Sequence, residues 1–175
     1  MNRPGIEEAK LKGRGRGMPK IIVIYYSRTG TTRRMAELIA EGIKKEKVKA
    51  VVKDVSILSV DELLDYSGII IGSPVYYGSM SAEVKRFIDA SVKLHGKLDG
   101  KVAAAFSSSA NIGGGNESTV LDILHAMLIH GMIIYGDPLG DHYGPVAVLK
   151  CDSRVKKECL RLGSRVAVMV KKLKL

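Results

Sequence analysis

The sequence KIIVIYYSRTGTT, residues 20–32, combines a buried strand, a polar turn and the start of a helix. Its apolar run, residues 21–26, is short and rich in β-branched and aromatic side chains, which is typical of a strand buried on both faces. Over residues 32–45 the apolar side chains recur at helical spacing. The turn between them, Ser27–Thr32, contains four hydroxyl side chains and one glycine. The strand therefore passes almost directly into the N-terminus of a helix.

This turn, Ser27–Thr32, predicts a binding site for an anion. The first backbone N–H groups of a helix lack partners, and the helix dipole adds roughly half a positive charge there. The hydroxyl groups can add donors, and Gly30 lets the backbone curl closely around a phosphate. The pattern is neither G-x-x-x-x-G-K-[ST] nor G-x-G-x-x-G, so a single monophosphate fits better than a nucleoside triphosphate or a dinucleotide. The alternative is purely structural: a threonine that caps the helix after a tight turn.

Apolar runs and amphipathic stretches alternate along the rest of the chain. We expect further strands at residues 48–55, 67–72 and 101–107, a fifth strand interrupted between GMIIYG and PVAVL, and helices at 60–66, 84–92, 117–130 and 152–173. Strands that alternate with helices predict an α/β fold, a parallel sheet covered by helices on both faces. No internal repeat and no second domain is visible.

Two later loops are expected at the same sheet edge as the polar turn. In open doubly wound sheets, ligands bind beyond the carboxyl ends of the strands, where the strand order reverses. The loop after the third strand, SPVYYGSMS, has adjacent tyrosines, Tyr76 and Tyr77, which could stack on a flat ligand or could instead pack locally or contact a partner chain. The loop after the fourth strand, SSSANIGGGNES, offers bare backbone to a planar polar edge. Together the three loops predict a site for a flat cofactor with a phosphate.

Four motifs resemble those of a known family: YYSRTGTT, GSPVYYGSMSAEVKRFID, FSSSANIGGGNES and HGMIIYG. They are similar to the flavodoxin-like FMN proteins and, within these, to the WrbA-type NAD(P)H:quinone oxidoreductases, over most of residues 20–174. The resemblance implies a flavodoxin-like, doubly wound, five-stranded parallel sheet with strand order 2-1-3-4-5. It also implies FMN as the cofactor, NAD(P)H as a co-substrate, and a homodimer or homotetramer.

The resemblance further implies which residues form the site. Ser27–Thr32 would hold the FMN phosphate, Val75–Tyr77 would contact the ring and ribityl chain, 107–115 would close the other side, and His130 would reach the flavin from a helix end. The implied cofactor-binding residues are Ser27, Arg28, Thr29, Gly30, Thr31, Thr32, Pro74, Val75, Tyr76, Tyr77, Gly78, Ser107, Ser108, Ser109, Ala110, Asn111, Ile112, Gly113, Gly114, Gly115 and His130.

Two residues are candidates for a catalytic role, His130 and Tyr143. The resemblance includes a P-Y-G turn near DHYGPV, so His142 or Tyr143 could line the substrate side. For His130 an alternative follows from its position just before Gly131, because a histidine there would favour the helix C-terminus while the glycine caps it.

Three functions are compatible with these residues. In the first, a hydride from NAD(P)H reduces FMN, and a quinone stacked between Tyr77 and His95 collects the electrons. In the second, the protein carries single electrons between redox partners, although known carrier flavodoxins tend to be acidic and this chain has a net charge of +10. In the third, a flavin-free scaffold binds an acidic partner or nucleic acid through its basic N-terminus. Compared with the WrbA type, the chain has Thr29 in place of a common tyrosine, no tryptophan, and a shorter stretch between IIYG and HYGP.

Length and composition set the remaining expectations. With 175 residues, 46% of them hydrophobic, the chain is long enough for one well-filled core. We expect a flexible basic extension at residues 1–19, for which nucleic-acid binding is the less favoured interpretation, and a single FMN-binding domain at 20–175. No apolar run approaches the ~18 residues of a membrane span, so we expect a cytoplasmic protein. Cys151 and Cys159 have neither the spacing of a metal site nor that of a disulfide framework, and no metal is expected.

Overall fold

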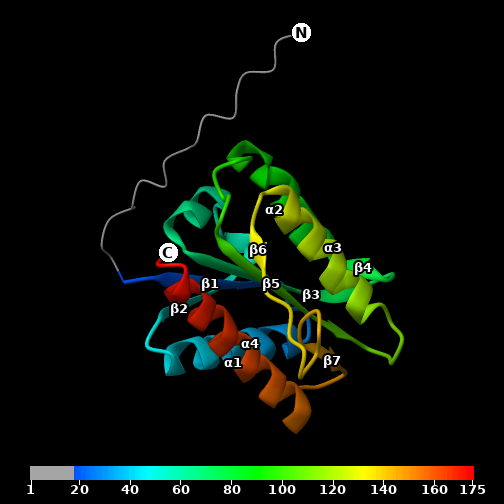
Figure 1. Cartoon of the computed structure of the whole chain (residues 1–175). Helices are drawn as coiled ribbons and strands as arrows, with labels where there is room; N and C mark the ends of the chain where they lie inside the picture. Colours follow the sequence, from blue (N-terminus) through cyan, green and yellow to red (C-terminus); the bar gives the residue numbers. More distant parts are fainter. Residues whose placement is uncertain (1–17) are drawn as a thin grey trace.

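The computed structural model describes residues 18–175, which form a sheet between two layers of helices (Figure 1). The strands are β1 (Lys20–Tyr25), β2 (Lys49–Asp54), β3 (Gly68–Tyr76), β4 (Ser79–Met80), β5 (Val102–Ser109), β6 (Ile133–Ile134) and β7 (Val146–Val148). The α-helices are α1 (Thr31–Lys45), α2 (Ala82–Ala90), α3 (Asn116–Ile129) and α4 (Ser153–Lys172), and short 3₁₀ helices cover Val55–Ile57, Val60–Asp65 and Ser91–Leu94. The helix predicted at 60–66 is thus a 3₁₀ helix, and the one predicted at 84–92 changes to 3₁₀ geometry at Ser91.

The sheet has the predicted doubly wound order. Its main path is β2-β1-β3-β5-β6, and every pairing along this path is parallel. The fifth strand is interrupted as predicted: β6 pairs with the start of β5 at Val102, and β7 pairs with the end of β5 at Ser107. The remaining strand, β4, pairs antiparallel with the end of β3.

One predicted boundary was wrong. The third strand continues past Gly72 to Tyr76, so Pro74, Val75 and Tyr76 lie in β3 and not in a loop. Proline is tolerated in this strand because the pairing of β3 with β1 ends at Gly72, which leaves that side of β3 without a ladder to complete. The strand extension carries these residues beyond the edge of the sheet, where the cleft described below begins.

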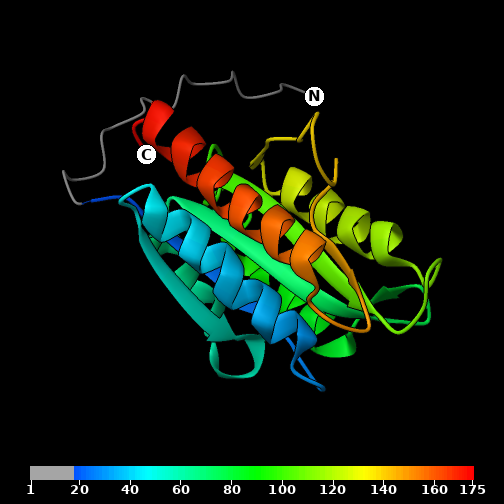
Figure 2. The same cartoon turned by 90° about the horizontal axis from the view of Figure 1, so that it is seen from below.

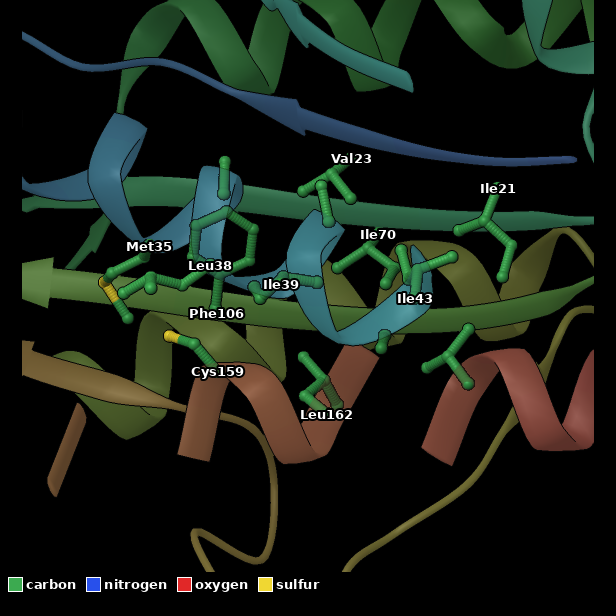
Figure 3. Packing of buried hydrophobic residues seen from close by; sticks show 14 of the residues in the cluster. Ile21, Val23, Met35, Leu38, Ile39, Ile43, Ile70, Phe106, Cys159 and Leu162 are labelled. Carbon is green, nitrogen blue, oxygen red and sulfur yellow. The ribbon is translucent and has the colours of Figure 1, made fainter. Parts of the chain in front are cut away.

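Each face of the sheet has its own apolar core. Ile21 and Val23 face α1 and α4, whereas Ile22 and Ile24 face the layer that contains α2 and α3. Figure 3 shows the first of these clusters, in which Cys159 packs beside large aliphatic side chains. Because both faces are covered, β1 has no alternation of polar and apolar residues, as its sequence predicted. Burial raises the pKa of the Cys159 thiol, so this residue is a packing residue and stays protonated.

Helices α1 and α4 run side by side over the first core (Figure 2). Two glycines bring their backbones together: a Cβ on Gly42 would collide with the carbonyl group of Leu160, and a Cβ on Gly163 would collide with that of Ile39. Side chains are therefore excluded at both positions. This contact fixes the direction of α1 and hence the place at which its N-terminus, the predicted anion site, opens.

No helix in the described part of the chain is both long and apolar enough to cross a bilayer. Within residues 18–175 there is also no group of three histidine, cysteine or acidic side chains that could hold a metal ion. The predicted basic extension, residues 1–19, lies outside the described residues except for Met18 and Pro19, which precede β1.

Candidate functional site

A cleft of about 340 Å³ lies at the carboxyl edge of the sheet. It is lined by residues from all three predicted loop regions and by one residue from a fourth segment. The lining residues are Arg28, Thr29, Thr31, Thr32, Pro74, Val75, Tyr76, Ser108, Ser109, Ala110 and Leu149. The fold thus brings together, in one open cavity, segments that are far apart in the sequence, as the strand order requires.

The turn Ser27–Thr32, hereafter the phosphate loop after the ligand predicted for it, leaves the N-terminus of α1 free to bind a ligand. Gly30 is the N-cap residue, in the left-handed region with φ of 96°, and no side chain caps the helix. The alternative in which a threonine caps this helix is therefore wrong. The Ser27 hydroxyl accepts a hydrogen bond from the Gly30 N–H at 3.1 Å and shapes the loop itself. Because the first turn also lacks an acidic residue, the open N–H groups and the helix dipole favour an anion.

Two hydroxyls of the phosphate loop connect it to the rest of the cleft. The Thr32 hydroxyl is buried and lies 2.9 Å from the Ser108 hydroxyl, a hydrogen bond in which either group can donate. The Thr31 hydroxyl donates to the carbonyl oxygen of Leu149 at 3.0 Å. These two threonines therefore fix the geometry of the cleft, while Thr29 remains to face a ligand.

A β-hairpin formed by β3 and β4 makes the second side of the cleft. Its two-residue turn consists of Tyr77 and Gly78, with φ of 50° and 81°, the pattern of a type I′ turn. Tyr76 lines the cleft and is 38% exposed, whereas Tyr77 at the tip is fully exposed. A tyrosine at positive φ is strained, and such strain is concentrated at ligand sites.

The hairpin is attached to helix α3. Ser118 donates a hydrogen bond to the carbonyl oxygen of Gly78 at 2.7 Å, and Ser79 donates to the carboxylate of Asp122 at 2.6 Å. Gly115, with φ of 100°, lies so close that a Cβ on it would be 2.6 Å from the Cα of Gly78. The turn of the hairpin and the start of α3 therefore behave as one unit.

The segment from Ser107 to Gly115 makes the third side. Ser107 is buried and donates to Asn116, whose side-chain amide donates in turn to the hydroxyl of Ser109 at 2.8 Å. Ser108, Ser109 and Ala110 line the cleft, whereas the predicted site residues Asn111–Gly115 are not part of its lining. Ile112, Gly113 and Gly115 also line a neighbouring hollow of about 460 Å³ at the start of α3. Ser107 is thus a buried support of this segment, and the residues that line the cleft follow it in the sequence.

The residues of the cleft fit an FMN molecule. Its phosphate needs donors without a fixed partner, which the start of α1 provides, and Arg28 is the charged member of the cleft lining. Its flat ring needs an apolar or aromatic surface and a polar edge, which Tyr76 and the backbone after Ser109 offer.

Comparison with known proteins identifies the family. The flavodoxin domain family matches residues 22–117, from β1 to the start of α3. This chain belongs to the flavodoxin family. A curated relative, named flavodoxin, from Aquifex aeolicus (strain VF5) is 41% identical over 162 residues, which cover 87% of this chain and 88% of the relative. An NAD(P)H dehydrogenase (quinone) from Archaeoglobus fulgidus is 33% identical over 193 residues, covering 89% of this chain and 100% of the relative.

A solved structure extends the comparison to three dimensions. The flavodoxin, WrbA-like protein from Agrobacterium tumefaciens superimposes with a TM-score of 0.75 at 31% identity, and the match covers 88% of this chain and 98% of that one. The chain is thus a flavodoxin-like FMN protein close to the WrbA group.

Within this flavodoxin-family chain, His130 does not reach the cleft. It follows the C-terminus of α3, and α3 starts at the cleft and runs away from it for 14 residues, a length of roughly 21 Å. His130 lies near the start of β5, where its Nε2 is 2.8 Å from the Ser91 hydroxyl and its ring is 6.4 Å from that of His95. Burial, and secondarily His95, lower the pKa of His130. The structure thus places His130 outside the lining of the cleft in its own chain.

Tyr143 and His142 also lie away from the cleft. Both belong to the connection between β6 and β7 and line a separate, smaller hollow with Glu117 and Val146. The His142 Nδ1 is 2.7 Å from the carbonyl oxygen of Asp137, within the same connection. The structure consequently does not bring the two predicted catalytic candidates, His130 and Tyr143, to the ligand cleft of this chain.

One lining residue was missed by the sequence interpretation, namely Leu149. It follows β7, the second half of the interrupted fifth strand, and it is 70% exposed with φ of 63°. The strand order did indicate its position, because the carboxyl end of β7 lies at the same sheet edge as the carboxyl ends of β1 and β5. Nothing in its residue type, however, pointed to a ligand.

Proposed function

We propose that this flavodoxin-family protein is an NAD(P)H:quinone oxidoreductase that uses FMN bound in the cleft. The observation on which this depends most is the uncapped N-terminus of α1, which opens into a cleft of about 340 Å³. Ser27–Thr32 would bind the phosphate, Val75–Tyr77 one side of the ring, and Ser108–Ala110 the other. The named NAD(P)H dehydrogenase (quinone) relative supports the reaction.

The chain's own residues would bind and orient, and no protein nucleophile is needed. FMN, when bound, supplies two-electron transfer chemistry. Arg28 and the start of α1 would offset the phosphate charge, and the ring of Tyr76 would hold the flat part of the cofactor. Tyr77 at the hairpin tip is fully exposed, so its ring could reach the flavin and still leave aromatic surface for a planar quinone or nicotinamide.

An electron carrier is the second candidate, because the relative from Aquifex aeolicus is named flavodoxin. The two functions differ in whether a nicotinamide nucleotide reduces the flavin directly. The decisive experiment is an anaerobic visible spectrum of the FMN-loaded protein before and after addition of NADPH or NADH. We expect rapid bleaching of the flavin band by one of them. Bleaching by dithionite alone would contradict the enzyme and favour a carrier that depends on a reductase partner.

The phosphate site itself has a direct test with a matched control. Thr29 is exposed, lines the cleft and is free to be replaced without disturbing the buried Thr32–Ser108 pair. Thr29→Glu places a carboxylate beside the phosphate, and we expect FMN affinity to fall at least tenfold, which is about 1.4 kcal/mol. Thr29→Gln has nearly the same size without the charge and should weaken binding much less. Equal affinities of the two variants would mean that the phosphate binds elsewhere.

A further inference from the structure

Leu149 is the central residue of an unusual turn at the edge of the cleft. Its φ is 63°, and the N–H of Lys150 donates to the carbonyl oxygen of Val148 at 2.7 Å, which closes a three-residue γ-turn. This form of γ-turn, with positive φ at the centre, is rare and strained, and a residue with a Cβ increases the strain. Glycine would adopt the same conformation without this cost.

The backbone of this strained residue connects two sides of the cleft. The Leu149 N–H donates to the carbonyl oxygen of Ser109 at 2.8 Å, and its carbonyl oxygen accepts the hydrogen bond from the Thr31 hydroxyl at 3.0 Å. One residue therefore holds the phosphate loop at a fixed place relative to the strand end that forms the opposite side. A tight turn with few accessible conformations suits this purpose.

The side chain of Leu149 adds a second observation. It lines the cleft and is 70% exposed, so it contributes little to the packed core. An apolar side chain at a strained position, in contact with solvent, lowers stability on both counts. This loss of stability is offset only when a bound molecule covers the Leu149 side chain. Because Leu149 is hydrogen-bonded to Thr31 and Ser109, which both line the cleft, that molecule would be the ligand of the cleft.

We infer that Leu149 is a positioning residue that makes the cleft selective for a phosphorylated flavin over an unphosphorylated one. Its turn sets the distance between the phosphate loop and the Ser108–Ala110 side, and its side chain covers the ligand between them. The inference rests on the proposed FMN site and adds to it the residue that determines this selectivity.

Two substitutions separate the backbone from the side chain. Leu149→Ala removes the covering side chain but keeps a Cβ and hence the stiff turn, so binding of FMN and riboflavin should weaken by similar factors. Leu149→Gly also frees the turn, and the phosphate loop then loses its fixed place. For this variant we expect FMN affinity to fall at least fivefold more than riboflavin affinity, while the melting temperature of the flavin-free protein stays equal or rises.

A matched control removes strain elsewhere. Lys47 has φ of 59° and follows the far end of α1, away from the cleft. Lys47→Gly should also preserve or raise the melting temperature, but it should leave the ratio of FMN to riboflavin affinity unchanged. Flavin titrations of wild type, Leu149→Ala, Leu149→Gly and Lys47→Gly, followed by fluorescence quenching, give this ratio for each protein.

The outcomes are distinct. A Leu149→Gly protein with the wild-type ratio overturns the positioning role, and so does a ratio that changes equally in Lys47→Gly. If the wild type binds neither flavin, the proposed function fails instead. The turn is then tested by amide hydrogen exchange. Faster exchange at position 149 and its neighbours in Leu149→Gly than in the wild type supports a stiff connection, and unchanged exchange overturns it.

Discussion

Gly115→Ala tests whether the hairpin and helix α3 form one unit beside the cleft. Gly115 has φ of 100°, and a Cβ on it would be 2.6 Å from the Cα and 3.0 Å from the carbonyl carbon of Gly78. The neighbours it meets are backbone atoms, so they cannot rotate away as a side chain would. The hairpin must move, and the hydrogen bond from Ser118 to the Gly78 carbonyl oxygen must lengthen or break.

The expected loss of stability has two parts. The left-handed conformation costs a residue with a Cβ about 1–2 kcal/mol. Overpacking against the backbone of Gly78 adds about 1–3 kcal/mol. At roughly 2–4 °C per kcal/mol for a chain of this size, the melting temperature should fall by about 4–20 °C. Because Tyr76 moves with the hairpin, FMN affinity should decrease as well.

A second glycine of the same segment provides the control. Gly113 also has positive φ, 69°, but a Cβ on it would meet nothing within 4 Å. Gly113→Ala should therefore show the conformational cost alone and a smaller fall in melting temperature. The two variants are compared by thermal unfolding without flavin and by FMN titration. If Gly115→Ala is no worse than Gly113→Ala in both assays, the close contact with Gly78 has no energetic role and the reasoning is refuted.

Two further predictions concern single side chains. Tyr77→Ala should weaken FMN binding tenfold or more, about 1.4 kcal/mol, with unchanged stability of the flavin-free protein because the ring is fully exposed; unchanged affinity would rule out this ring as part of the flavin site. The pKa of Asp137 is lowered to about 2, chiefly by its hydrogen bond with Arg161. The ionised carboxylate therefore stabilises the fold above the pKa of the unfolded state, and this contribution is lost as the pH falls from about 4 to 2. Asp137→Asn should therefore lower the unfolding free energy at pH 7 by up to about 2 kcal/mol, with a smaller difference from wild type at pH 2 in urea unfolding; an equal difference at both pH values would contradict it.

The sequence was sufficient to predict the sheet and the edge at which the ligand cleft lies. The reason is physical: β1 is buried on both faces, which requires helices on both sides, and parallel strands end at one edge. The phosphate loop followed from its place between β1 and α1. The interruption of the fifth strand was also visible, because turn residues separate Ile134 from Val146.

Other features depended on geometry that a residue pattern does not contain. His130 was placed at the site from resemblance, although the length and direction of α3 take it to the opposite edge of the sheet. The hairpin was read as a loop because Pro74 and Gly78 are turn-forming residues, and Tyr77–Gly78 lacks the usual Asn-Gly signal of a two-residue turn. Leu149 gave no signal because its role comes from a backbone conformation and not from its chemical type.

The interrupted fifth strand gives this fold a natural insertion point. The half formed by β6 pairs with the start of β5 and the half formed by β7 pairs with its end, so each half has its own pairing with β5. Leu139, in the connection between them, is 81% exposed. Extra residues could be added beside it without shifting the register of either half, since a longer surface loop costs little entropy. A protein engineer could therefore attach a peptide or a small domain there, beside the end strand β6 of the sheet, and leave the phosphate loop unchanged.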